Sequence, residues 1–389
     1  MGALFSSALD SRPRPQIPTA VVVRAVFLMM AARMGSLHAL EQEQANRGWP
    51  GWLGAVLPSA DTVGRVFARM ALESLRLAIR TLYGRFRRNK VLGKTHGHSV
   101  LIVDGHESSS SYFRCCPGCL ERILHTHDGD RVQFYHRDVL AMLSGERFPF
   151  LLDVEPQRKG EDEVSCALRL LGRVLRDYPR AFDLVVADGL YLKAPFFHLL
   201  LDHGKDLIVV LKDERRDLLQ DAQGIFRLAE PVVLVDGNVE RRMWDIEGFD
   251  SWTSLRVPVR VVRSVETRSI QRQRTGVLET VTSEWIWATT LTPAKTPTLA
   301  VVHLGHDRWL IENRAIREMV TYWHADHVYR HHPQAITAFL LILMLTLNLF
   351  RAFLSLNIKP CLRARHTQLY FARLLAAGLY EERPEPVPP

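Results

Sequence analysis

The sequence predicts an α/β fold in which a mixed sheet is flanked by helices, with a helical domain ahead of the sheet and a β-rich insertion within it. Three observations predict this fold. Apolar residues recur at helical spacing over residues 18–86. Short apolar runs then alternate with amphipathic helical patterns over residues 99–212, which implies a sheet covered by helices. Over residues 226–300 the helical pattern gives way to segments rich in Val, Thr and Trp, which are typical of strands.

The composition is that of a soluble globular protein whose charge is unevenly distributed. Of the 389 residues, 47% are hydrophobic and 24% are charged, and this length allows two or three domains. The net charge of +8 arises in residues 1–99, which carry 14 Lys and Arg against 5 Asp and Glu. A basic block ahead of a neutral body favours a nucleic-acid-binding arm joined to a catalytic body. The alternative is a solvated basic surface.

Cysteine usage and hydropathy predict a cytoplasmic protein without a membrane span. The five cysteines are an odd number, and three of them cluster, which does not indicate a disulfide framework and fits a reducing compartment. The apolar run over residues 335–350 is about 16 residues long, shorter than the roughly 20 that a bilayer requires. We therefore expect a buried core helix there. The alternative is a membrane protein that uses this run as its span.

Residues 1–98 are predicted to form a basic, helical DNA-binding domain. We expect a helix over residues 18–45, a break at WPGW (49–52), and one or two helices over residues 58–86, capped by Ser59 or Asp61. A basic run follows the last apolar stripe, and helix-turn-helix geometry would fit this arrangement. The DNA contacts expected from this run are Arg80, Arg85, Arg87, Arg88 and Lys90.

Residues 99–225 are predicted to form the first part of a catalytic core. Three strands come first, followed by an amphipathic helix, a strand, a short helix and a fifth strand, which is the element order of an RNase H-like fold. The expected ranges, in this order, are 99–104, 131–138, 147–154, 161–178, 182–188, 194–203 and 206–212.

The remaining chain is divided into three predicted parts. Residues 226–300 are the β-rich insertion, and residues 301–356 are the second part of the core, with helices over 307–323 and 334–355. Residues 357–389 form a C-terminal tail, whose final segment RPEPVPP is expected to be disordered.

Two aspartates stand at the ends of predicted strands. Asp104 and Asp188 each follow a short apolar run, and each is followed by a glycine. Glycine allows a sharp turn and leaves room beside the carboxylate. A single Asp at a strand end is more often a turn former than a ligand. The same pattern occurs twice here, however, on strands that the fold order makes neighbours, and ligands collect at the carboxyl edge of a sheet.

Glu312 is the third candidate acid. It lies four residues after Arg308 on a predicted helix, so both side chains share one face beside an apolar stripe. Hard divalent cations such as Mg²⁺ prefer oxygen ligands. Two ions about 4 Å apart can activate the attacking oxygen and stabilise the leaving one in an in-line phosphodiester displacement. Three carboxylates suit the binding of such a pair.

Four stretches of the chain resemble bacterial insertion-sequence transposases of the DDE superfamily: IVDGHE, VVADGLY, KDLIVVLK and RWLIENRAIREMVTYWHADHVYRHH. The resemblance covers roughly residues 95–350. It implies an RNase H-like fold, two Mg²⁺ ions, and the cutting and joining of DNA at element ends. By this resemblance, Asp104, Asp188 and Glu312 are the metal-binding catalytic residues, and Arg308 matches the family's arginine, a DNA contact.

The chain departs from the family's Tyr–Arg–Glu–Lys signature at two positions. Gly305 stands where the Tyr is expected, and Met319 stands where the Lys is expected. The phosphate contacts credited to that Tyr and Lys therefore have no counterpart at these positions. Glu318 is the nearest alternative to Glu312 on the same helix.

A cysteine cluster provides a candidate structural zinc site. Cys116 and Cys119 flank a Pro-Gly turn, and His125 and His127 follow closely enough to complete four ligands. A zinc ion there would order the long segment between the first two predicted strands. The alternative is a Pro-Gly turn with buried thiols.

Two further aromatic and histidine groups have open roles. His324, His327, His331 and His332 are candidates for DNA or metal contacts, or are ordinary polar residues near the rim of the active site. Trp285 and Trp287 are suited to stacking on a displaced base, but as alternating strand residues we favour a core position for them.

These features predict the transposase of a bacterial insertion sequence, a homodimer on double-stranded DNA that binds terminal inverted repeats and target DNA. One alternative is an RNase H-like structure-specific nuclease, which would prefer junctions or flaps to element ends. The other is a non-catalytic DNA-binding derivative of a transposase, whose DNA binding would be unchanged by EDTA and which would cut under no metal.

Overall fold

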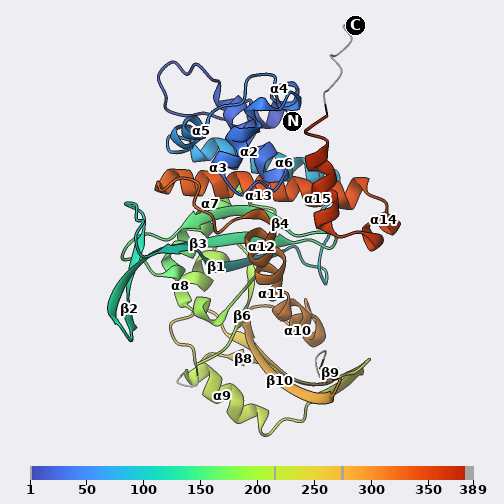
Figure 1. Ribbon diagram of the computed structural model, residues 1–389. Helices are drawn as coiled ribbons and strands as arrows, with labels where there is room; N and C mark the ends of the chain where they lie inside the picture. The colour runs from blue at the N-terminus through green and yellow to red at the C-terminus, as the bar shows by residue number, and fades with distance from the viewer. Residues whose placement is uncertain (1, 214–215, 273–275, 382–389) are drawn as a thin grey trace. The chain divides into compact units, whose positions relative to one another are not determined.

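The computed structural model describes residues 2–213, 216–272 and 276–381 (Figure 1). The described chain forms two compact units, each assembled from separate stretches. The first unit consists of Met1–Gly93, Gly105–Tyr178 and Ile311–Pro389, and the second of Lys94–Asp104 and Pro179–Leu310.

The N-terminal part of the first unit is helical, as predicted. Ser59 caps one helix, because its Oγ accepts a hydrogen bond from the backbone N–H of Thr62 at 3.3 Å. The predicted break at WPGW is wrong. That segment lies in helix α4, because Pro50 falls in the first turn, where its missing N–H is tolerated. The elements are α1 (Gly2–Phe5), α2 (Thr19–Ala31), α3 (Leu37–Gln42), η1 (Glu43–Ala45), α4 (Gly48–Leu53), α5 (Ala60–Phe67) and α6 (Leu72–Arg88).

The strands of the first unit form an antiparallel arrangement beside strand β1 (Val100–Ser111), which contributes residues to both units. β2 (Leu120–Thr126) and β4 (Phe150–Pro156) both pair with the long strand β3 (Gly129–Ser144). β2 is a strand that the sequence pattern did not predict. Helix α7 (Glu163–Asp177) packs on β3 and β4, with Val164, Leu170 and Leu171 among its buried residues.

Helix α13 (Pro333–Asn357) forms the centre of the first unit, where it packs against β4, α2 and α6 (Figure 1). The buried amide of Asn348 is used on both sides: it donates to the backbone oxygen of Leu151 at 2.8 Å and accepts from the Leu151 N–H at 2.9 Å. By length and composition alone α13 is the one described helix that could cross a membrane. Its packing is that of the predicted core helix.

A buried ion network fastens α6 to the strand and helix beneath it. Arg76 of α6 lies 3.0 Å from Asp153 of β4. Arg173 of α7 lies 2.5 Å from both Asp153 and Glu155. These ion pairs therefore join helices α6 and α7 to strand β4 within the first unit.

The second unit has a mixed sheet. β1, β5 (Leu184–Ala187) and β6 (Asp206–Val210) are parallel, and β10 (Leu278–Thr289) pairs with β6 in the antiparallel sense. β9 (Val259–Gln271), β8 (Val239–Phe249) and β7 (Val232–Asp236) follow in order. The predicted β-rich insertion therefore extends the sheet directly, through Trp287 opposite Val210. The helical elements are η2 (Gly189–Tyr191), α8 (Ala194–Leu201), α9 (Asp217–Phe226) and α10 (Thr298–His306).

The chain then continues with a largely helical C-terminal stretch, which belongs to the first unit from Ile311 onward. Its elements are α11 (Trp309–Ile311), the π-helical segment η3 (Glu312–Ile316), α12 (Arg317–Trp323), α13, α14 (Pro360–Arg365) and α15 (Gln368–Ala377). The predicted fold class, a mixed sheet flanked by helices as in RNase H-like proteins, is confirmed. The tail RPEPVPP, expected to be disordered, lies outside the described residues.

Candidate active site and basic groove

Asp104 and Asp188 lie side by side in the second unit. β1 and β5 are parallel, and Val103 is paired with Ala187 in their register, so the two aspartates are the next residues on neighbouring strands. Adjacent strands are about 4.8 Å apart. The expectation that Asp104 ends its strand is wrong, because β1 continues to Ser111. What ends before Asp104 is the pairing with β5, which leaves both carboxylates at one edge.

The glycines after the two aspartates provide space and not a turn. The φ angles of Gly105 and Gly189 lie outside the left-handed region that favours glycine. A Cβ atom on Gly105 would lie 2.3 Å from the Glu163 carboxyl carbon, and one on Gly189 would lie 3.1 Å from the backbone oxygen of Val210. Two roles were expected for these glycines, a sharp turn and space for neighbouring atoms. The structure supports only the second role.

Arg308 is held against Asp104. Its Nη1 lies 3.6 Å from Asp104 Oδ2, and its guanidinium lies over the Trp309 ring, 4.2 Å from the centroid. The arginine is only 4% exposed. The resemblance predicts a DNA contact for Arg308, but the contact that the structure shows is an ion pair with a candidate catalytic carboxylate.

Asp188 is kept ionised by its surroundings. Burial alone would raise the pKa of its carboxyl, but the Gly189 N–H, Arg308 and Lys212 together hold that pKa below its ordinary value. The N–H of Gly189 donates to Oδ1 at 2.7 Å, and Lys212 Nζ lies 3.2 Å from the same oxygen. A carboxylate that is charged at neutral pH is the form that a divalent cation requires.

Glu312 begins the π-helical segment η3 of the first unit. π-Helical turns are rare and occur frequently at functional sites. Glu318, the alternative acid, has its Oε2 2.9 Å from Arg351, whose guanidinium also donates to the backbone oxygen of Pro149 at 3.1 Å. Glu318 therefore forms an ion pair with Arg351 within the first unit, and the choice between Glu312 and Glu318 as the third acid rests on the family motif.

The two departures from the family signature have structural reasons. A Cβ on Gly305 would lie 2.4 Å from the indole of Trp287, so a tyrosine does not fit there. Trp287 is fully buried, which confirms the core position favoured for it. Met319 is also buried, in the first unit, where a lysine would lose its hydration.

A groove of about 810 Å³ in the first unit has charged walls that are predominantly basic. Five arginines and a single acid, Glu318, are the charged residues on its walls. Arg314 and Arg317 follow Glu312 in sequence, three residues apart on one helical face. The sequence pattern gave no sign of this groove, because its arginines are scattered along the chain: Arg33, Arg147, Arg314, Arg317 and Arg351.

The predicted basic run lies at the C-terminal end of α6. Arg80 faces Asp177 of α7 at 3.4 Å. The other four members are exposed and available to a ligand: Arg85, Arg87, Arg88 and Lys90.

The predicted zinc ligands are only partly brought together. Cys116 and Cys119 lie close to one another, but the histidine beside them is His136. His125 lies 2.7 Å from Asp130 on an exposed hairpin, and His127 beyond it is fully exposed. His136 was missed because it lies 17 residues after Cys119 in the sequence, and only the folding of β3 brings it to the cysteine turn.

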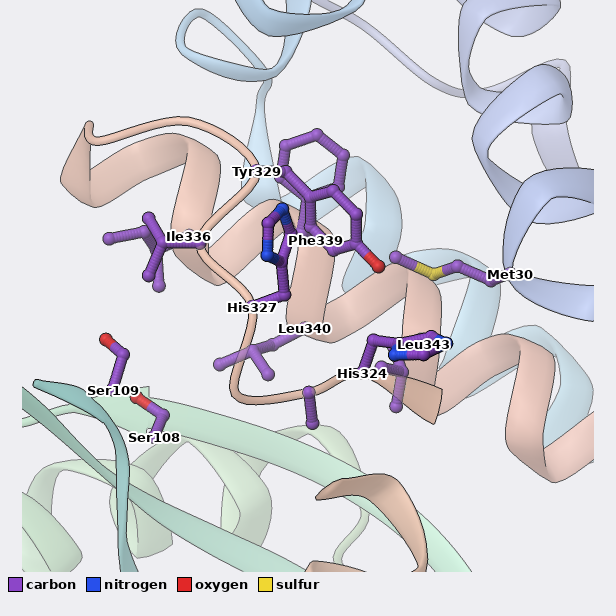
Figure 2. Close-up of a pocket in the computed structure, with 12 residues that line it drawn as sticks. Met30, Ser108, Ser109, His324, His327, Tyr329, Ile336, Phe339, Leu340 and Leu343 are labelled. Atoms are coloured by element: carbon purple, nitrogen blue, oxygen red, sulfur yellow. The ribbon is translucent and has the colours of Figure 1, made fainter. Parts of the chain in front are cut away.

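Two of the four later histidines line a small cavity of the first unit. Figure 2 shows His324 and His327 around this cavity of about 20 Å³ with the side chains of Tyr329, Phe339 and Leu340. His324 Nε2 lies 3.2 Å from the backbone oxygen of Arg33, a contact within the protein interior. His324 therefore has a partner within the protein, whereas His327 is exposed and its ring lies 4.7 Å from that of Tyr329.

Residues 95–349 match the model of a known protein family, described as the transposase DDE domain. This range begins just before β1 and ends within α13, so it includes Asp104, Asp188 and Glu312. None of the curated proteins matches the chain. Paired carboxylates can bind hard divalent cations, and a groove rich in arginine can bind phosphodiesters.

Proposed function

Because the chain belongs to the family of transposases with a DDE domain, we propose that it is the transposase of a bacterial insertion sequence. It cuts DNA at the ends of the element and joins the resulting 3′-hydroxyls to target DNA. The observation that carries this proposal is the pair Asp104 and Asp188, which follow directly paired residues on neighbouring parallel strands.

The residues fit two Mg²⁺ ions. Asp104 and Asp188 offer carboxylate oxygens, the ligand type that Mg²⁺ prefers, and the family motif supplies Glu312 as the third acid. When bound, Mg²⁺ supplies charge stabilisation for the attacking and leaving oxygens of a phosphodiester. The Gly189 N–H fixes the orientation of Asp188, and Arg308 supports Asp104 from its buried side.

DNA is bound, in this proposal, through its phosphates. The exposed arginines of the groove, Arg147, Arg314 and Arg317, suit the sugar–phosphate backbone, because guanidinium groups bind phosphate oxygens through paired hydrogen bonds. The exposed end of α6 adds a second basic surface for the terminal inverted repeats. We propose further that the protein acts in the cytoplasm, on the nucleoid, as a homodimer.

The proposal is tested by incubating the protein with matched element-end DNA and Mg²⁺, and measuring nicking and joining. Asp104→Asn and Glu312→Gln are expected to lower both rates by at least about 10²-fold. Asp206→Asn is the control. Asp206 begins β6, so it lies at the amino end of the parallel strands, whereas Asp104 and Asp188 lie at the carboxyl end, and it pairs with Lys295.

Undiminished joining by Asp104→Asn would contradict the assignment of this residue. Glu318→Gln separates the two candidates for the third acid. If Glu318→Gln abolishes cutting in a folded, DNA-binding protein while Glu312→Gln does not, Glu312 is misassigned. Cutting of flaps or junctions without any joining would identify a structure-specific nuclease instead.

A further inference from the structure

Two cysteines and a histidine in the first unit have the geometry of a metal centre. The Sγ atoms of Cys116 and Cys119 are 3.7 Å apart, and each lies 3.3 Å from Nε2 of His136. Tetrahedral zinc with Zn–S of about 2.3 Å and Zn–N of about 2.0 Å would separate two sulfurs by about 3.8 Å, and sulfur from nitrogen by about 3.5 Å. The observed separations match these values and are far from the roughly 2.05 Å of a disulfide.

The cysteine turn is built to present its sulfurs. The Cys119 N–H donates to the backbone oxygen of Cys116 at 3.0 Å, which closes the turn. The Cys116 N–H donates to Cys119 Sγ at 3.1 Å. These two hydrogen bonds fix the turn and orient the Cys119 sulfur.

Three distant parts of the chain meet at this turn. Cys116 and Cys119 follow β1, and His136 lies on β3. The start of α13 also reaches the turn, because a Cβ on Gly118 would lie 2.9 Å from Cγ of Pro333. All three candidate ligands are buried, and the apolar side chains packed around them include those of Phe134, Val328, Ile336 and Leu340. An apolar shell of this kind limits the access of solvent to a bound ion.

His331 follows the same region of the chain, but its ring nitrogens do not join the cluster of the three ligand atoms. It precedes Pro333 by two residues, and its Nδ1 is buried with no hydrogen-bond partner in the described structure. A buried imidazole nitrogen without a partner is unfavourable unless another group satisfies it.

We propose that Cys116, Cys119 and His136 bind a structural zinc ion. Thiolate and imidazole ligands select zinc over Mg²⁺, so this site is chemically distinct from the carboxylate pair. The ion ties the loop after β1 to β3 and to the start of α13. Its role is to hold these segments together and not to take part in phosphodiester chemistry.

The test is the metal content of the full-length protein, purified without a metal-binding tag from zinc-supplemented medium. About one zinc per chain is expected for the wild type and for the control variants Cys115→Ser and His125→Ala. Cys115 is exposed and adjacent to the turn, and His125 is the histidine that local spacing favours. Cys119→Ser and His136→Ala are expected to lose most of the zinc.

Cobalt substitution of the wild type keeps the test independent of whether the variants fold. Two thiolates in a tetrahedral site give intense visible bands and a thiolate-to-cobalt charge-transfer band in the near ultraviolet. Absence of both zinc and these bands in folded wild-type protein would overturn the proposal, as would full zinc content in Cys119→Ser.

Discussion

The two aspartates of the candidate active site each lie beside a cation supplied by the chain itself. Arg308 lies against Asp104, and Lys212 lies against Asp188. The two cations differ in accessibility, because the Arg308 side chain is buried and the Lys212 side chain is largely exposed. A lysine at the surface can move aside when a metal ion or a phosphate approaches, whereas a buried arginine stays in place as part of the support of Asp104.

Gly305 offers a test of how tightly α10 packs against Trp287 of β10. Gly305→Ala is expected to lower the free energy of unfolding by about 2–4 kcal/mol, because the added Cβ would overlap the fully buried Trp287 indole. Urea unfolding measures the change. Gly172→Ala in α7 is the matched control: it has open space around its Cβ and is expected to stabilise by about 0.5–1 kcal/mol. Equal effects of the two substitutions would contradict the packing described for Gly305.

Asp138 on β3 gives a pH-dependent prediction. Burial raises the pKa of its carboxyl to about 6, and Oδ2 has no hydrogen-bond partner in the described structure. Because this pKa is raised in the folded state, the folded protein binds the proton more tightly, and stability is lost as pH rises from about 4 to about 6. Asp138→Asn is therefore expected to stabilise by up to about 3 kcal/mol at pH 8, and by less at pH 5.

Urea unfolding of wild type and Asp138→Asn at the two pH values checks this sign. A stabilisation that is larger at pH 5 than at pH 8, or a destabilisation at both, would contradict the account of a buried, poorly satisfied carboxylate.

Among the elements, α6 and α7 are joined to β4 by the buried ion network. Removing one member leaves the charges of its partners buried and uncompensated, which typically costs about 3–5 kcal/mol. Arg173→Met is expected to have an effect near the lower end of this range, since Arg76 still contacts Asp153. Arg176→Met, on the exposed side of the same helix, is the control, with an expected change below about 0.5 kcal/mol. Thermal or urea unfolding that cannot separate the two variants would contradict a structural role for the network.

The elements also show how far local pattern predicts the fold. Buried strands with continuous apolar runs, such as β5 and β6, were predicted almost to their ends, because such runs have few other interpretations. β2 was missed because most of its residues are exposed, so it has no continuous apolar run. It is a strand only because it pairs with β3. α4 was missed because Pro and Gly normally break helices, and only the position of Pro50 in the first turn allows one here.

The residues of the candidate active site also divide into those that local sequence pattern can predict and those that it cannot. Asp104 and Asp188 were found because each adjoins an apolar run. Glu312 still rests on the family motif. His136 and the arginines of the groove were not found, because only the folded chain brings them together from separate segments. The domain boundaries, the dimer and the DNA sites stay predictions.

For the whole molecule, the basic groove predicts how DNA binding responds to salt. Arg317 is exposed and lines the groove, and removing one cation that neutralises a phosphate should reduce the slope of log K against log salt by about 0.9. Arg317→Ala is therefore expected to weaken binding to all DNA sequences alike and to flatten this slope. Arg227→Ala, an exposed arginine that is not among the groove residues, is the control. A slope unchanged in Arg317→Ala would show that the groove does not bind the DNA backbone.

The central claim is that the carboxylates at the edge of β1 and β5 perform the chemistry of cutting. The most direct measurement is the single-turnover rate of cleavage of element-end DNA already bound to Asp188→Asn, with cleavage started by adding Mg²⁺. We predict DNA affinity like that of the wild type and a cleavage rate lower by at least about 10²-fold. Cleavage of the bound DNA at the wild-type rate, or a loss of cleavage that only follows a loss of DNA binding, would contradict the claim.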